Sequence, residues 1–279
     1  TTFAATDTIL AFTGTGAQTM TSAITTAGGA DGRGVIDIDN TGGLVTIDGA
    51  AGVNNTGLLT IDVATGATAK IMGGEVNVTG NVLGGGTLTI GGDDAVAAVG
   101  GTATSDVEFE GNVTLATLKI VGGAGSAAAS AAAGTDGGAV TRHDITGVTT
   151  ADVEVTGGAG AAGETNANNA GGQGGAVTAG DFAGKVIGAV TITGGRGGNG
   201  GAGGAGAVGG AGKAGGLVRT DFSGGVDGAV TINSGAGGVG GTASTAFAGG
   251  DAEAGGAVTL DDVAAAGTMT TLTDRKSVV

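Results

Sequence analysis

A strict period of three runs through residues 194–216 of the chain. Cut into triplets, the stretch reads GGR GGN GGA GGA GAV GGA GKA GG, with glycine first in every triplet and second in most. This period matches neither the α-helix nor the β-strand, but it matches an extended left-handed helix with three residues per turn. Such a helix has two edges of bare backbone and no internal hydrogen bonds. The stretch is therefore predicted to be ordered only where similar segments lie beside it.

The chain contains further segments of this kind. Three more glycine-rich stretches keep the period, namely 122–138, 157–175 and 237–256. A near-copy of one motif follows each stretch, and the copies start 37, 41 and 40 residues apart, at Ala139, Ala176, Leu217 and Ala257. We therefore predict a repeat array of about 40 residues per unit whose glycine-rich segments bundle in a polyglycine-II-like manner. The alternative is a low-complexity tail that is periodic by chance.

Two phenylalanines support a true structural repeat. Phe182 and Phe222 each follow Asp and precede a small residue and Gly. We predict that they occupy equivalent buried sites in successive units.

The earlier part of the chain predicts short β-strands. Runs such as 35–39, 44–48 and 58–62 alternate apolar and polar residues, and each run ends at Gly, Asn or Asp. The six Phe residues, with no Trp or Tyr, leave only a thin core of Val, Ile and Ala. The expected fold class is all-β, with a β-solenoid or a β-sandwich followed by the repeat array.

Composition narrows the range of functions. The net charge of −15 argues against nucleic-acid binding, and the absence of Cys excludes disulfides and zinc–thiolate sites. No apolar run approaches the roughly 20 residues of a membrane span. Abundant Thr, Gly, Asn and Ala without Cys suit an exported microbial protein, so the expected location is extracellular or at the cell surface.

Two resemblances follow from these patterns. The phrases LVTIDG, LLTIDV, GEVNVTGNV and GGGTLTIGG within residues 34–121 resemble the β-helical passenger regions of bacterial autotransporter and rickettsial-type surface proteins. The GGX triplets within 122–256 resemble the polyglycine-II bundles of phage tip adhesins and springtail antifreeze proteins. The second resemblance implies binding of receptors or ice through third-position side chains or connecting loops.

We predict four parts of the chain: an N-terminal β segment at 1–27, a solenoid or sandwich region at 28–121, the repeat array at 122–273 and a tail at 274–279. The tail reads DRKSVV, which resembles a translated sequencing-adapter remnant, and the alternative interpretation is an ordinary charged tail. The N-terminal segment has two interpretations. It is either the first strand or cap of its own domain, or a strand that completes a neighbouring subunit. Its candidate assembly residues are Phe3, Ile9, Leu10 and Phe12.

Candidate chemistry is sparse. Carboxylates at strand ends could bind Ca²⁺ if rungs stack, and the candidate ligands are Asp37, Asp39, Asp48 and Asp62. Solvated turn residues are the alternative interpretation. The single histidine, His143, has no evident nucleophile and is expected in a repeat loop. N-glycosylation sequons begin at Asn54, Asn77 and Asn112.

The sequence thus favours an extracellular structural protein that assembles with itself into a filament or surface layer. No catalytic residue is expected, and no cofactor other than Ca²⁺. One alternative is an adhesin that binds a cell or host surface. A second alternative is an ice-binding protein that uses Thr ladders such as Thr191 and Thr193.

Overall fold

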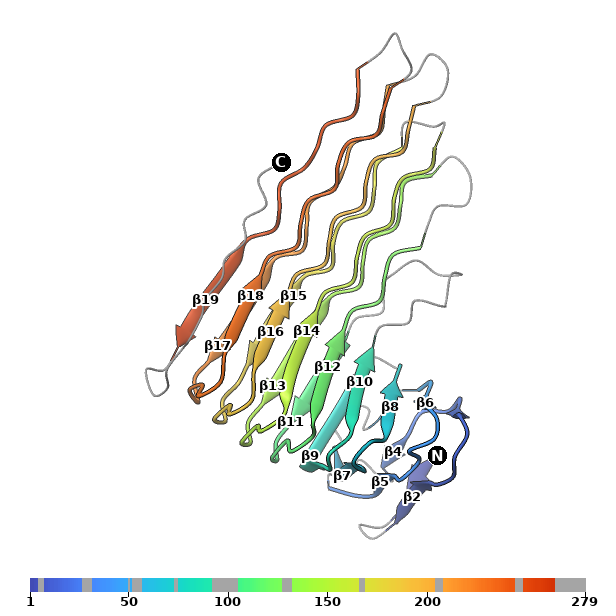
Figure 1. Ribbon diagram of the computed structural model, residues 1–279, viewed down its shortest axis with the longest axis vertical. Helices are drawn as coiled ribbons and strands as arrows, with labels where there is room; N and C mark the ends of the chain where they lie inside the picture. Colours follow the sequence, from blue (N-terminus) through green and yellow to red (C-terminus); the bar gives the residue numbers. More distant parts are fainter. Residues whose placement is uncertain are drawn as a thin grey trace.

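The computed structural model is all-β, and none of the residues it describes is helical. The described residues are 1–4, 8–26, 32–49, 51, 57–72, 75–91, 105–126, 132–165, 169–203, 208–243 and 248–263. Among these residues, most strands belong to two long sheets, one of nine strands and one of eight. Successive strands alternate between the two sheets, and the coils stack side by side from the N-terminal end (Figure 1). A short third sheet pairs β1 with β4.

The nine-stranded sheet consists of β2 (Ile9–Phe12), β5 (Val35–Ile38), β7 (Leu58–Val63), β9 (Glu75–Leu83), β11 (Ser105–Phe109), β13 (Val140–Ile145), β15 (Val177–Asp181), β17 (Val218–Phe222) and β19 (Val258–Val263). The eight-stranded sheet consists of β3 (Gln18–Met20), β6 (Val45–Ile47), β8 (Thr68–Ile71), β10 (Thr87–Gly91), β12 (Thr117–Val121), β14 (Asp152–Thr156), β16 (Val190–Thr193) and β18 (Val230–Asn233). The third sheet pairs β1 (Thr2–Phe3) with β4 (Thr25–Thr26).

Every pair of strands among the described residues is parallel, and like residues lie above one another. One inward column of the eight-stranded sheet is almost entirely Ile, and its fully buried members are Ile47, Ile71, Ile90, Ile120, Val155, Ile192 and Ile232. Stacked parallel coils make a β-solenoid, whereas the predicted alternative, a β-sandwich, is built from antiparallel strands. The sandwich alternative is therefore wrong.

The repeat predicted from the sequence is the repeat of the coils. The motif copies align at their first valines, since Val140 pairs with Val177, Val177 with Val218 and Val218 with Val258, and the register shifts further along the strands. Both sheets continue past residue 121, so the coils of the glycine-rich repeat array belong to the same stack as the coils of the earlier region.

The two repeat phenylalanines are fully buried, which confirms the prediction for Phe182 and Phe222. Their rings stack with centroids 5.0 Å apart and planes 8° from parallel.

The glycine-rich segments leave the eight-stranded sheet and return to the nine-stranded sheet (Figure 1). We call the two described halves of each segment the outgoing leg and the returning leg. The outgoing legs are 122–126, 157–165, 194–203 and 234–243, and the returning legs are 132–138, 169–175, 208–216 and 248–256. The legs run beside one another as undulating traces beyond the ends of the strands.

Hydrogen bonds join each leg to several neighbours. The Gly194 amide donates to the carbonyl of Asn233, the last residue of β18 before the next outgoing leg, at 2.9 Å. The Gly195 amide donates to Gly175 of the previous returning leg, at 2.8 Å, and its carbonyl accepts from Gly216 of its own returning leg, at 2.7 Å. The same pattern recurs three residues later through Gly197 to Ala236, Gly198 to Gly172 and Lys213 to Gly198. Backbone groups that the legs cannot satisfy internally are thus satisfied between them.

Burial follows the triplets as the sequence predicts. Gly194, Gly195, Gly197 and Gly198 are buried, while Arg196 at the third position is exposed. Neighbouring backbones occupy the space that a side chain would need at the first two positions. A Cβ added at Gly195, for example, would overlap the Gly158 carbonyl oxygen.

This packing predicts a sharp contrast between two Gly→Ala substitutions. Gly195→Ala should lower the free energy of unfolding by about 2–3 kcal/mol, because the new methyl group overlaps backbone on two neighbouring legs. Gly249→Ala is the matched control, since its Cβ would meet only the Gly241 carbonyl oxygen at 3.4 Å. Urea unfolding of both variants measures the difference. Equal effects would show that the legs are not packed in this way.

Candidate functional site

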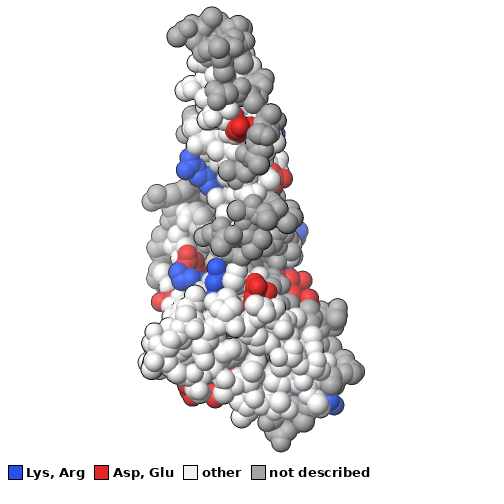
Figure 2. All heavy atoms as spheres, turned by 90° about the vertical axis from the view of Figure 1, so that its right-hand side faces the viewer, with Lys and Arg blue, Asp and Glu red and all other residues white. Residues whose placement is uncertain are grey.

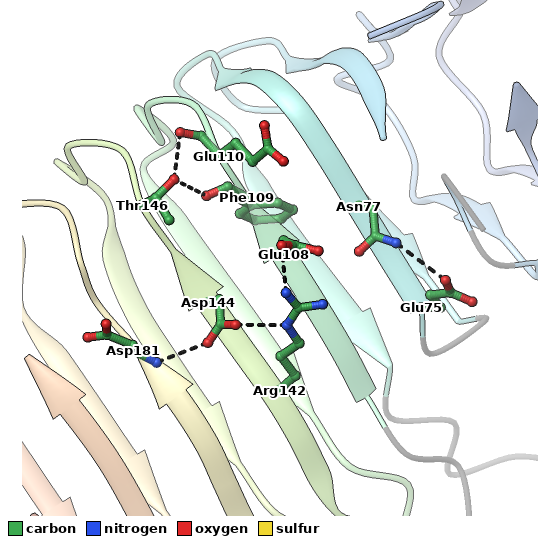
Figure 3. A network of polar contacts seen from close by, with 9 residues as sticks. All are labelled: Glu75, Asn77, Glu108, Phe109, Glu110, Arg142, Asp144, Thr146 and Asp181. Carbon is green, nitrogen blue, oxygen red and sulfur yellow. Dashed lines mark hydrogen bonds and ion pairs between the residues drawn. The ribbon is translucent and has the colours of Figure 1, made fainter. Parts of the chain in front are cut away.

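Polar side chains form a ladder on the outer face of the nine-stranded sheet (Figure 3). One residue from each of five successive strands contributes, and together we call them the polar ladder: Asn77, Glu108, Asp144, Asp181 and Asp221. Four of these five are carboxylates on adjacent parallel strands, which lie roughly 4.8 Å apart. Like charges directly opposite one another destabilise a sheet, so the ladder requires compensation.

Arg142 supplies that compensation at the centre of the ladder. Its Nη2 forms an ion pair with Glu108, and its Nε donates to Asp144 Oδ2 at 2.7 Å (Figure 3). The hydrogen bond to Asp144 is the main reason why the pKa of the Arg142 guanidinium is raised. Nearby, burial raises the pKa of the Asp106 carboxyl, and the charge of Arg142 partly opposes that shift. The guanidinium therefore holds two strands together.

Carboxylates also bind groups on the following coil. Asp144 Oδ1 accepts from the Asp181 amide at 3.1 Å, and the Asp181 carboxylate accepts from Ser223 Oγ at 2.9 and 3.0 Å. Asp152 Oδ1 accepts from the Ala189 amide at 3.0 Å in the same manner. These contacts connect residues that are one coil apart, so the role of the carboxylates here is to connect coils.

Asparagine side chains also accept hydrogen bonds from backbone amides on the following coil. Asn81 Oδ1 accepts from the Asn112 amide, and Asn112 Oδ1 accepts from the Val148 amide, each at 2.9 Å. Single sequence motifs did not identify this ladder, although the recurrence of polar residues one repeat apart was a usable signal.

Arg142→Met tests the ladder, because it keeps the side-chain length and removes the charge. It should lower the free energy of unfolding by about 1–2 kcal/mol, since Glu108 and Asp144 would then face each other uncompensated. Lys185→Met is the control, because the Lys185–Asp227 pair is more exposed and should contribute less than about 1 kcal/mol. Denaturant unfolding of the two variants at neutral pH compares the costs, and similar costs would count against a central role for Arg142.

The predicted calcium ligands are only partly brought together. Asp37 and Asp62 are aligned on adjacent strands, and burial first, then the charges of Asp39 and Asp62, raises the pKa of Asp37. Asp48 follows β6, which belongs to the other sheet. Among the described residues, no group of three or more His, Asp or Glu side chains is arranged to hold a metal ion.

His143 lies inside the core, so the prediction of a repeat-loop histidine is wrong. It occupies β13, is fully buried, and fills the space over Gly180, where a Cβ would overlap its ring. Its Nε2 lies 3.1 Å from Thr220 Oγ1, two coils away, and that hydroxyl donates to the Gly180 carbonyl at 3.3 Å. These contacts fit a neutral ring whose Nε2–H donates to Thr220 while the hydroxyl donates to Gly180. The ring also lies 5.6 Å from that of Phe182.

Burial lowers the pKa of His143 to about 4. As the pH falls below about 6.5, the unfolded chain binds a proton at this residue while the folded chain does not, so stability decreases. We expect this histidine to remove about 2 kcal/mol of stability between pH 7 and pH 5. His143→Gln should lack that component, because glutamine does not titrate. Urea unfolding of both proteins at the two pH values gives the difference, and parallel pH profiles would contradict the prediction.

The predicted glycosylation residues differ in accessibility. Asn77 is only 4% exposed and its amide donates to Glu75 Oε1 at 3.3 Å, so the folded chain offers little of it to a modifying enzyme. Asn112 is exposed, with its Oδ1 engaged by the turn described above. Asn54 lies outside the described residues.

The N-terminal segment folds onto its own chain as the first coil of the stack. Phe3 is 1% exposed and packs against Gly34, and Phe12 is 8% exposed. Leu10 is half-buried against the core, whereas Ile9 is 61% exposed. Two of the predicted assembly residues are therefore core residues of this chain, and the other two lie at the open end of the stack.

An open hollow of about 490 Å³ lies where the eight-stranded sheet meets the outgoing legs. Its lining includes glycine backbone from the outgoing legs together with Thr156, Thr193 and Arg196.

Comparisons with protein-family models, with curated proteins and with solved structures find no significant match for this chain. Within the described residues, the model contains no helix of the length and apolarity that crossing a membrane requires.

Proposed function

We propose that the protein is an extracellular structural protein whose chains assemble into filaments or a surface layer. The observation that carries the proposal is the openness of the core at both ends of the stack. Five partly buried apolar side chains pack against the core, and four of them belong to strands at or next to the ends: Leu10, Met20, Val258 and Leu260. In the interior coils the corresponding core residues are almost completely buried.

Within the described residues, each terminal strand also has one sheet edge without a partner strand. Among the described residues, β2 and β3 are the last strands at one end, and β19 and β18 at the other. Open edges pair with further strands unless they are covered, and a head-to-tail contact that does not close into a ring produces a filament. Exposed core and open edges at the same places support self-association as the principal partner interaction.

The leg bundle supports a mechanical role. Its three-residue hydrogen-bond pattern, with glycine inside and side chains outside, is that expected of polyglycine-II-like packing. Such a bundle gives a rigid extension without a large apolar core, which suits a chain with 68 glycines and six phenylalanines. Coil-to-coil use of the polar residues favours this role over catalysis, so we propose no enzymatic activity.

Negative-stain electron microscopy of the concentrated full-length protein tests the proposal. We expect unbranched filaments or ordered sheets, and light scattering should report a mass that rises with protein concentration. A monodisperse monomer throughout the accessible concentration range would contradict self-assembly.

A cell- or host-surface adhesin is the second candidate, and the 490 Å³ hollow beside Arg196 is the observation that favours it. Saturable binding of the monomer to intact cells, lost on Arg196→Ala, would be the expected result for an adhesin. Ice binding has weaker support. Thr191 lies between Glu154 and Thr231, and the ion pair of Glu154 with Lys119 interrupts the Thr column.

A further inference from the structure

We propose that the filament contact pairs β2 of one copy with β19 of a second copy, in parallel, with Leu10 beside Val258 and Phe12 beside Leu260. This inference rests on the proposed self-assembly and names its interface. Each strand is the last of the nine-stranded sheet at its end of the described chain. A translated copy therefore continues the same sheet in the same strand direction.

The backbone of β2 presents alternate residues to its open edge. The Thr8 and Phe12 carbonyls accept from the Val35 and Asp39 amides, at 2.9 and 3.0 Å, so these residues face β5. Backbone groups alternate between the two edges of a strand, and those of Ile9 and Ala11 consequently point away from β5. Both residues are exposed.

The backbone of β19 has the complementary phase. The Ala257 carbonyl accepts from the Val218 amide at 2.8 Å, so Ala257 and Thr259 face β17. The groups of Val258 and Leu260 therefore face the open edge. Within the chain, Val218 is aligned with Val258 and bonds to its neighbour Ala257. By the same geometry, Val258 aligned with Leu10 would bond to Ile9 and Ala11, whose groups are directed outward.

The side chains satisfy the same register. Leu10 and Phe12 align with the buried Ile36 and Ile38, so they point into the core. Val258 aligns with the buried Val218 and packs against the core, as does Leu260. A slip of one residue would place the apolar side chains of one strand outside the core, and a slip of two would leave one of them unpaired. Hydrogen-bond phase and core direction thus exclude odd slips, and the pairing of both apolar side chains selects this register.

Charge favours contact at this end. The chain has a net charge of −15, yet residues 8–26 contain no charged side chain. Figure 2 views the molecule from the N-terminal side of the stack, and the lower body is mostly uncharged there. Two acidic copies can approach through this face with little mutual repulsion.

Disulfide trapping tests the pairing, because the chain has no cysteine of its own. Ala11 and Thr259 are the exposed, aligned neighbours across the proposed contact, and adjacent strands bring Cα atoms to about 4.8 Å, within disulfide range. The double variant Ala11→Cys, Thr259→Cys should give a ladder of covalent oligomers on mild oxidation. An intramolecular bond is impossible, since β2 and β19 lie roughly 38 Å apart along the sheet.

The control is Val148→Cys with Thr259→Cys. Val148 is 41% exposed but lies in the turn after β13, away from both ends, so no ladder is expected. As a second test, Ala11→Pro removes an outward amide and should weaken association at least about tenfold relative to Ala11→Ser, while leaving the pairing with β5 intact.

The outcomes separate the two proposals. If the unmodified protein forms filaments but the Ala11/Thr259 variant gives no ladder, or no more than the control, the pairing is wrong and self-assembly stands. If the unmodified protein remains monomeric at high concentration, both the pairing and the proposed function are wrong.

Discussion

Hydrogen bonding between successive coils is the interaction on which the rest of this structure depends. The chain has too few large apolar side chains for a thick core, and its 68 glycines make backbone ordering costly in entropy. Parallel pairing compensates by joining each described coil to its neighbours through both sheets. The same direction of bonding continues beyond the strands into the legs, where amides such as that of Gly195 bond to other legs. Sheet and bundle are therefore two parts of one backbone network.

Side chains reinforce that network. Arg142 joins two strands, Asp181 binds Ser223 of the next coil, and His143 reaches past Gly180 to Thr220. Phe182 and Phe222 stack along the same direction within the core. Interactions along the stack direction keep the coils in register, and in a thin solenoid each coil contacts only its neighbours. This arrangement explains why polar residues recur from one coil to the next.

The two ends of the described stack leave core side chains partly exposed. An interior coil is covered on both sides, whereas Leu10 and Leu260 are partly exposed, and within the described residues their strands have a sheet neighbour on one side only. The exposed surface at each end is thus the same kind of surface that the interior coils already bury against one another. Assembly by translation would repeat an interaction that the chain uses within itself, and this continuity is the physical basis for proposing a filament.

Local periodicity determined much of this protein. Alternation in runs such as 35–39 predicted the strands, and the GGX triplets of 194–216 predicted buried glycines with exposed third positions, because both signals depend only on neighbouring residues. The spacing of the motif copies likewise predicted the equivalent burial of Phe182 and Phe222. Only the tertiary structure showed that the fold is a solenoid and not a sandwich, that His143 is buried, and that the first strands fold onto their own chain. Those outcomes depend on which coils become neighbours, as in the His143–Thr220 contact across 77 residues, and no local pattern specifies that.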